Sequence, residues 1–179
     1  FIPTGVLAAT MPGFGAHQAK HVAAIPNLAV FGALIHDEGG GVVRRGPGRE
    51  PIVTYKMDKR DRAAIPKAIR LMAEVFFDAG AKECYLPIIG HEPVTADELR
   101  KLDLDRLYGP QIESASQHPL GSCRMGSDPK TSVVDHTGKV WGVDNLYVAD
   151  GSVVPTSLGV NPQVTVMAMA LRIARKMLD

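Results

Sequence analysis

The chain has few cysteines, few aromatic residues and no long uninterrupted apolar run. Its two cysteines, Cys84 and Cys123, are too few for a disulfide framework. We interpret them as free thiols, which favours a reducing, cytoplasm-like compartment without establishing it. The longest apolar stretch, Ala23 to Ile35, is interrupted by Pro26 and Asn27 and is shorter than the roughly 18 residues of a membrane span. Membrane association is therefore not indicated.

An excess of charge of either sign is also missing. The chain has 20 Lys and Arg against 19 Asp and Glu, a formal net charge of +1. Neither a nucleic acid nor an anionic membrane surface is therefore an expected partner. A hydrophobic fraction of 45% and a charged fraction of 22% are typical of a soluble globular protein. The length of 179 residues suits one domain, or parts of two.

The sequence begins with Phe1 rather than Met and shows no signal-peptide pattern at that end. We expect a piece of a longer polypeptide whose N-terminal part precedes Phe1. Targeting information would then lie in that part.

The middle of the chain predicts a hairpin followed by a helix. Short strands are expected at 28–36, 42–45 and 51–57, the last two antiparallel around a Gly-Pro-Gly turn. Ile65, Ile69, Met72 and Phe76 recur on one face of a helix that Gly80 ends. Pro66 predicts that this helix begins near Ala64 or is distorted in its first turns.

Further along, we expect a strand at 82–89 and a short helix opened by a capping box from Thr95 to Glu98. A small hairpin is expected over 133–141 and a buried strand over 146–149. The last helix should begin at Pro162, capped by Asn161. Its apolar face is predicted to carry Val164, Met167, Leu171, Ala174 and Leu178.

Two polar side chains could perform acid–base and hydrogen-bonding chemistry. His118 lies in the glycine-rich loop Gln117-His118-Pro119-Leu120-Gly121, and an imidazole can take a proton from a hydroxyl group near neutral pH. A structural histidine is the alternative. Asn161 could donate its amide to a substrate oxygen, or only cap the last helix.

Two backbone features could contact a ligand. Asp150-Gly151-Ser152 follows an expected strand, where α/β sheets commonly present ligand contacts, although a tight turn explains it equally. The free N–H groups at the start of the last helix, near Gln163 and Val164, favour a ring that gains negative charge. His17 and His21 could share a helix face as metal ligands, but no third ligand is evident, so no metal is predicted.

Together these residues resemble the C-terminal part of the glucose–methanol–choline (GMC) flavin oxidoreductases. The resemblance is close over about 110–179 and looser over 28–90. It is carried by an ordered run of matches: His118-Pro119-Leu120-Gly121, Arg124-Met125-Gly126, Val133-Val134-Asp135, Gly142-Val143, Asn145-Leu146-Tyr147-Val148, Asp150-Gly151-Ser152, Pro155 and Gly159-Val160-Asn161-Pro162. The segment 155–162 also resembles the long-chain alcohol oxidase branch.

The resemblance implies FAD as cofactor and oxidation of a small-molecule alcohol. The residue matching His118 would take the hydroxyl proton while hydride passes to flavin N5, and Asn161 would orient the substrate oxygen. Asp150 and Gly151 match positions near the ribityl–pyrophosphate chain. The flavin edge is matched by Asn161, Pro162, Gln163 and Val164.

The implied fold class is α/β (α+β). Residues 1–27 would be a leading segment, and 28–132 an antiparallel-sheet substrate-binding region with helices. Residues 133–179 would return, by a strand and a helix, to the dinucleotide-type FAD-binding domain.

The Gly-rich dinucleotide fingerprint of the family is absent from this sequence. We therefore expect the N-terminal FAD-binding part to come from the same longer protein or from another chain, and activity to depend on it. A flavin-containing lyase of the same scaffold and a non-catalytic fragment are the alternatives.

Overall fold

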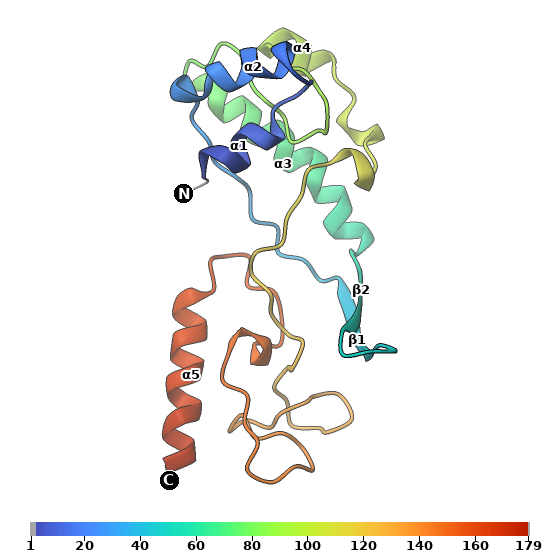
Figure 1. Cartoon of the computed structure of the whole chain (residues 1–179), viewed down its shortest axis with the longest axis vertical. Helices are drawn as coiled ribbons and strands as arrows, with labels where there is room; N and C mark the ends of the chain where they lie inside the picture. The colour runs from blue at the N-terminus through green and yellow to red at the C-terminus, as the bar shows by residue number, and fades with distance from the viewer. Residues whose placement is uncertain (1–2, 179) are drawn as a thin grey trace. The chain divides into compact units, whose positions relative to one another are not determined.

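A computed structural model describes residues 3–178 of the chain, and Figure 1 shows its elements. Its contacts divide the chain into two units, the first formed by residues 1–33 and 63–115 and the second by residues 34–62 and 116–179. Within residues 3–178, helices and one small antiparallel sheet make up the regular structure. No helix within residues 3–178 is both long and apolar enough to cross a bilayer.

The first unit is mainly helical. Its elements, in chain order, are α1 (Thr4–Thr10), α2 (Ala16–Ala23), the 3₁₀ turn η1 (Ile25–Asn27), most of α3 (Lys59–Asp78), α4 (Ala96–Lys101), η2 (Leu104–Arg106) and η3 (Gly109–Gln111). Its core consists of Ile69 and Ala73 of α3, packed with the buried residues Cys84, Leu86, Ile88, Val94, Leu99 and Leu104. The predicted inner face of α3 is confirmed, because Ile69 is buried and Ile65 and Phe76 pack against this core.

Helix α3 begins at Lys59, five residues before the predicted start near Ala64. Two acidic side chains explain the earlier start, since Asp58 Oδ1 accepts from Arg60 N at 2.8 Å and Asp61 Oδ2 accepts from Asp58 N at 3.3 Å. Capping of this kind satisfies N–H groups that have no partner inside the helix. Pro66 consequently lies inside the helix rather than at its beginning.

Three further predictions have different outcomes. The capping box of α4 is confirmed, because Thr95 Oγ1 accepts from Glu98 N at 3.4 Å and Glu98 Oε2 accepts from Thr95 N at 2.8 Å. The strand expected at 82–89 is wrong, because this segment makes only the isolated bridges Cys84↔Val94 and Ile88↔Ile112. The strand expected at 28–36 is also wrong, since these residues form no ladder with a neighbour.

The second unit contains the sheet. Strands β1 (Gly40–Arg45) and β2 (Pro51–Lys56) pair antiparallel, with Gly40 opposite Lys56 and Arg45 opposite Pro51. The predicted hairpin is therefore confirmed. Every residue of both strands is exposed, so the pair is held by its backbone ladder and not by a buried face.

A separate core of the second unit lies beside the last helix. Val134, Val153 and Ile173 are each 0% exposed, and they come from the 133–141 turn, from η4 (Gly151–Val153) and from α5 (Gln163–Leu178). The 133–141 hairpin is reduced to the single bridge Val134↔Val140. The buried strand expected at 146–149 is wrong, because only Tyr147 forms a bridge, to Lys139, and Leu146 is exposed.

Helix α5, red in Figure 1, turns a different face to this core than the sequence predicts. Ile173 is fully buried and Met169 packs with it. The predicted apolar face is exposed, with Met167 at 63%, Leu171 at 54% and Val164 at 75%. Apolar residues occur on both sides of α5, so periodicity alone does not identify the side that is covered.

Candidate functional site

The loop that carries His118 runs beside the turn that carries Asp150 and Gly151. Cys123 N donates to Ser152 O at 3.0 Å, and Met125 N donates to Val153 O at 2.9 Å. These backbone bonds fix the glycine-rich loop against η4. Two of the segments that the sequence analysis selected, far apart in the chain, are thus neighbours in the second unit.

Gly151 is the point at which this turn also meets α5. A Cβ at Gly151 would lie 3.2 Å from Pro119 O, 3.3 Å from Leu120 Cδ2 and 3.5 Å from Val166 Cγ2. A side chain at this position would therefore press on the residues that follow His118 and on the second turn of α5. Gly151 has a structural reason to be glycine, and it brings three of the predicted segments into one place.

His118 and Asn161 are both exposed, and both belong to the second unit. Within the described residues 3–178, no hydrogen bond of either side chain is found, so the two are not joined directly. The structure brings together the segments next to them, through Gly151. Both side chains are free to contact a ligand.

The N-terminus of α5 is open to a ligand. The first bond of this helix runs from Val166 N to Pro162 O at 2.8 Å, and helical structure begins at Gln163, one residue later than predicted. Pro162 is buried, whereas Gln163 and Val164 are exposed. The first N–H groups of a helix point outward with partial positive charge, which favours an electron-rich group in front of them.

Asp150 is held as a carboxylate by its neighbour. Its Oδ1 accepts from Ser152 Oγ at 2.5 Å and from Ser152 N at 2.8 Å. These two hydrogen bonds lower the pKa of Asp150 below its ordinary value, and the bond from the Ser152 hydroxyl group has the larger effect. The carboxylate also caps η4, so the acidic side chain has a structural role in forming the turn around Gly151.

His36 lies next to the segment that contains Asn161, which the sequence analysis missed. A Cβ at Gly159 would lie 3.0 Å from His36 Cβ and 3.4 Å from its Nδ1. Gly159 has a φ of +66°, a conformation that favours glycine. No sequence pattern connects residue 36 with residue 159, because only the folded chain brings them together.

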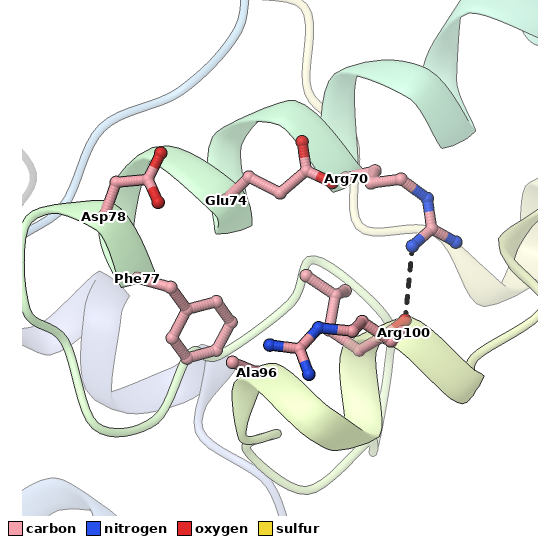
Figure 2. A pocket seen from close by; sticks show the side chains of 7 residues that line it. Arg70, Glu74, Phe77, Asp78, Ala96 and Arg100 are labelled. Atoms are coloured by element: carbon pink, nitrogen blue, oxygen red, sulfur yellow. Dashed lines mark hydrogen bonds between the residues drawn. The ribbon is translucent and has the colours of Figure 1, made fainter.

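The first unit contains a separate hollow, of about 180 Å³, between α3 and α4 (Figure 2). Charged side chains of both signs line it, among them Arg70, Glu74 and Arg100. Arg70 is engaged there structurally, because its guanidinium donates to Leu99 O at 3.2 Å and to Leu102 O at 3.0 Å. None of the predicted site residues lines this hollow.

A second set of chemically active side chains also lies in the first unit. Three possible ligand atoms, one from each residue, lie within 4.8 Å of one another; the residues are His17, His21 and Glu92. The sequence analysis found no third ligand for the two histidines, and the structure brings Glu92 to them.

Comparison with known proteins identifies the class to which this fold and loop arrangement belong. The family model described as GMC oxidoreductase matches residues 43–170, and the chain is a member of the GMC oxidoreductase family. The proposed resemblance is therefore confirmed, and the mixed helix and antiparallel-sheet fold agrees with it.

Individual relatives support the same assignment. The chain is 35% identical over 173 residues to an uncharacterized GMC-type oxidoreductase of Mycobacterium tuberculosis (strain ATCC 25618 / H37Rv), covering 96% of this chain and 27% of the relative. It is 29% identical over 192 residues to the long-chain-alcohol oxidase FAO1 of Arabidopsis thaliana, covering 99% and 25%. The chain thus spans about a quarter of the length of these relatives.

A solved structure shares the fold. The crystal structure of pyridoxine 4-oxidase from Mesorbium loti has a TM-score of 0.56 and 25% sequence identity. The match covers 79% of this chain and 28% of that one. The likeness therefore extends over most of the described residues.

Proposed function

We propose that this chain forms the C-terminal part of an FAD-dependent oxidoreductase that oxidises an alcohol. Membership of the GMC family supports the reaction class. The convergence at Gly151 of the His118 loop, the Asp150 turn and the start of α5 carries the assignment of the site. The exposed His118 directly precedes Pro119, which lies beside Gly151, and the exposed Asn161 precedes α5. In this proposal the imidazole and the carboxamide act together to bind and deprotonate a hydroxyl group.

The residues present fit a flavin. Asn161, Gln163 and Val164 are exposed, and the outward N–H groups of the first turn of α5 can face an electron-rich ring edge. The ribityl–pyrophosphate chain would pass beside Asp150 at the turn that contains Gly151, whose side-chain space is filled by the protein itself, with Pro162 behind the ring edge. FAD, when bound, would supply the two-electron acceptor for a CH–OH donor.

His118 is the proposed acid–base residue. As a neutral imidazole, it accepts the proton of the alcohol hydroxyl group while the carbinol carbon gives up its hydride. Asn161 donates an amide hydrogen to the same oxygen and fixes its direction toward His118. Neither side chain is engaged with other residues in 3–178, so both roles are available to them.

The proposed partner is the N-terminal FAD-binding part, in the same longer polypeptide or on another chain. The exposed Val164, Met167 and Leu171 face of α5 supports this proposal, because an apolar stripe of this kind is normally covered. Residues 28–132 would contribute the substrate-binding region. Residues 133–179 would return to the FAD-binding domain.

Replacing His118 tests the acid–base role. In the complete flavoprotein, we expect His118→Ala to lower the turnover number by about 10²–10⁴-fold with FAD content unchanged. Steady-state kinetics with an alcohol, together with the flavin absorbance of the purified protein, measures both quantities. His136→Ala is the matched control, because His136 is an exposed histidine of the same unit.

Three results would contradict the proposal. Full turnover in His118→Ala would remove the acid–base role. An oxidised flavin that does not bleach when alcohol is added in a stopped-flow experiment would remove the redox reaction and favour a lyase on the same scaffold. A protein that remains colourless with its N-terminal part present would favour a non-catalytic role.

A further inference from the structure

Helix α2 presents two imidazoles on one side. His17 and His21 are four residues apart, and their ring centroids are 4.9 Å apart in an edge-to-face arrangement. Residues at this spacing are neighbours on a helix surface. The pair can therefore contact one ion from a single helix, which is a common way for a protein to provide two nitrogen ligands.

Glu92 supplies a carboxylate to the same point. Its Oε1 lies 3.4 Å from His17 Nε2, and its Oε2 lies 3.3 Å from His21 Nε2. The Cys84↔Val94 bridge fixes the segment before and after Glu92, with backbone hydrogen bonds of 2.8 and 2.9 Å. Helix α2 thus carries the two histidines, and the backbone bridge holds the segment that carries Glu92.

His21 is prepared as a ligand. Its side chain is 6% exposed, and its Nδ1 lies 2.9 Å from Tyr85 Oη. The buried Nε2 has no hydrogen-bond partner within the described part of the chain, although it is 3.3 Å from the Glu92 carboxylate. The short distance without hydrogen-bond geometry favours the tautomer in which Nδ1–H donates to Tyr85. Nε2 then directs its lone pair toward a carboxylate, an arrangement that a cation stabilises.

The His17 imidazole lies against Gly13, in space that is free because glycine has no side chain. A Cβ at Gly13 would lie 2.0 Å from His17 Nδ1, so the imidazole occupies the space that any other residue would fill. Gly13 also has a φ of +82°. Contact on the Nδ1 side leaves Nε2 as the nitrogen that faces Glu92.

We propose that His17, His21 and Glu92 bind a Zn²⁺ ion. Ligand atoms about 2.0–2.1 Å from a tetrahedral zinc lie roughly 3.3–3.4 Å from each other. His17 Nε2 lies 3.4 Å from one Glu92 oxygen and His21 Nε2 lies 3.3 Å from the other, and one ligand atom of each residue lies within 4.8 Å of the others, so a small side-chain adjustment brings all three to one ion. Nitrogen ligands with one carboxylate suit zinc better than calcium or magnesium. His17 and Glu92 are 53% and 56% exposed, so water can complete the coordination. Tyr85 orients His21 from behind, as partners of zinc-bound histidines do.

The ion would join α2 to the 84–94 segment. It lies in the first unit, whereas His118 and Asn161 lie in the second. The zinc proposal therefore does not rest on the proposed alcohol oxidation, and the role of the ion would be to fix the N-terminal helices to the core of the first unit.

Zinc titration of the full chain tests this proposal. After treatment with EDTA and removal of the chelator, ZnCl₂ is titrated by isothermal calorimetry, and the unfolding temperature is measured with and without the ion. We expect one Zn²⁺ per chain and a higher unfolding temperature. His17→Gln and Glu92→Gln should each weaken binding more than tenfold, and Tyr85→Phe by about 10–100-fold.

Two substitutions serve as matched controls. His136→Gln removes an exposed histidine outside the cluster, and Glu83→Gln removes an exposed carboxylate close to it in sequence. Both should bind zinc as the unsubstituted chain does. His17 and Glu92 are half-exposed, so their replacement leaves no cavity, and circular dichroism verifies the fold. The proposal is overturned if the chain takes up no stoichiometric zinc, or if His17→Gln and Glu92→Gln both bind it with unchanged affinity.

Discussion

Single residues of the second unit define the shape of the candidate site. Asp150 and Ser152 form the turn around Gly151, and their hydrogen bonds lower the pKa of the Asp150 carboxyl group. A group whose pKa is lower in the folded than in the unfolded state adds stability above its unfolded pKa. That stability is lost as the pH falls through the folded pKa.

We expect Ser152→Ala to raise the pKa of Asp150 toward its ordinary value, because the hydroxyl hydrogen bond is the largest cause of the shift. The variant should be less stable than the unsubstituted chain at neutral pH, and the difference should shrink in acid once Asp150 is protonated in both proteins. Carboxyl ¹³C NMR titration gives the pKa, and denaturant unfolding at two pH values gives the stability. Ser116→Ala, at an exposed position in the same unit, is the control. An unchanged Asp150 titration would refute the assigned cause.

At the scale of the element, α5 is fixed by one side only. Ile173 is fully buried, and a Cβ at Gly138 would lie 2.8 Å from its Cγ2, so the 136–138 turn closes directly over it. Arg172 donates to His136 O at the same turn. The other side of α5 makes no comparable contact in the described residues.

Truncations on the two sides of α5 should therefore differ in cost. We expect Ile173→Ala to lower the free energy of unfolding by about 2–5 kcal/mol, the range for large-to-small changes in a core. Leu171→Ala, at 54% exposure, should change it by no more than about 0.5 kcal/mol. Urea unfolding of both variants measures the difference. Equal losses would mean that α5 is covered on both sides.

Local signals in the sequence predict the elements that depend on near neighbours. The β1–β2 hairpin, the inner face of α3 and the capping box of α4 need only residues close in sequence, and they are confirmed. The strands expected at 28–36 and 146–149 fail because a strand requires a partner, and the sequence does not say whether one is present. The prediction of the buried face of α5 is wrong for a related reason. Which face is buried depends on the contact with the 133–141 turn, and the sequence does not reveal that contact.

For the candidate site too, some features could be predicted from the sequence and others depend on the folded chain. Residue types and order selected His118, Asp150, Gly151 and Asn161 before the fold was known. The convergence at Gly151, the approach of His36 to Gly159 and the position of Glu92 beside two histidines all depend on tertiary contacts. No periodic pattern encodes contacts of that kind, so they could not be predicted from the sequence.

At the scale of the whole molecule, exposed apolar surface is the main feature. The hairpin carries exposed Val42 and Val43 on β1 and exposed Ile52 and Val53 on β2, and the α5 face carries Met167 and Leu171. Each buried side chain of this size contributes about 1.5–3 kcal/mol. Such surface favours association, either with the proposed FAD-binding part or with another copy of the chain.

A charge on the exposed face of α5 should weaken that association. We expect Met167→Lys to reduce FAD retention in the complete protein at least tenfold, and to reduce self-association of the isolated chain. Flavin content after gel filtration and sedimentation velocity measure the two effects. Arg175→Ala, at an exposed polar position of the same helix, is the control. Undiminished FAD retention in Met167→Lys would exclude this face as the point of contact.

The two cysteines differ in a way that can be used experimentally. Burial raises the pKa of the Cys84 thiol, so its reactive thiolate is scarce near neutral pH. Cys123 is only half-buried, and its backbone N–H donates to Ser152 O beside Gly151. A maleimide fluorophore will therefore attach at Cys123 in preference to Cys84. The sequence thus offers a native attachment point for an optical probe beside the candidate site, without an engineered cysteine.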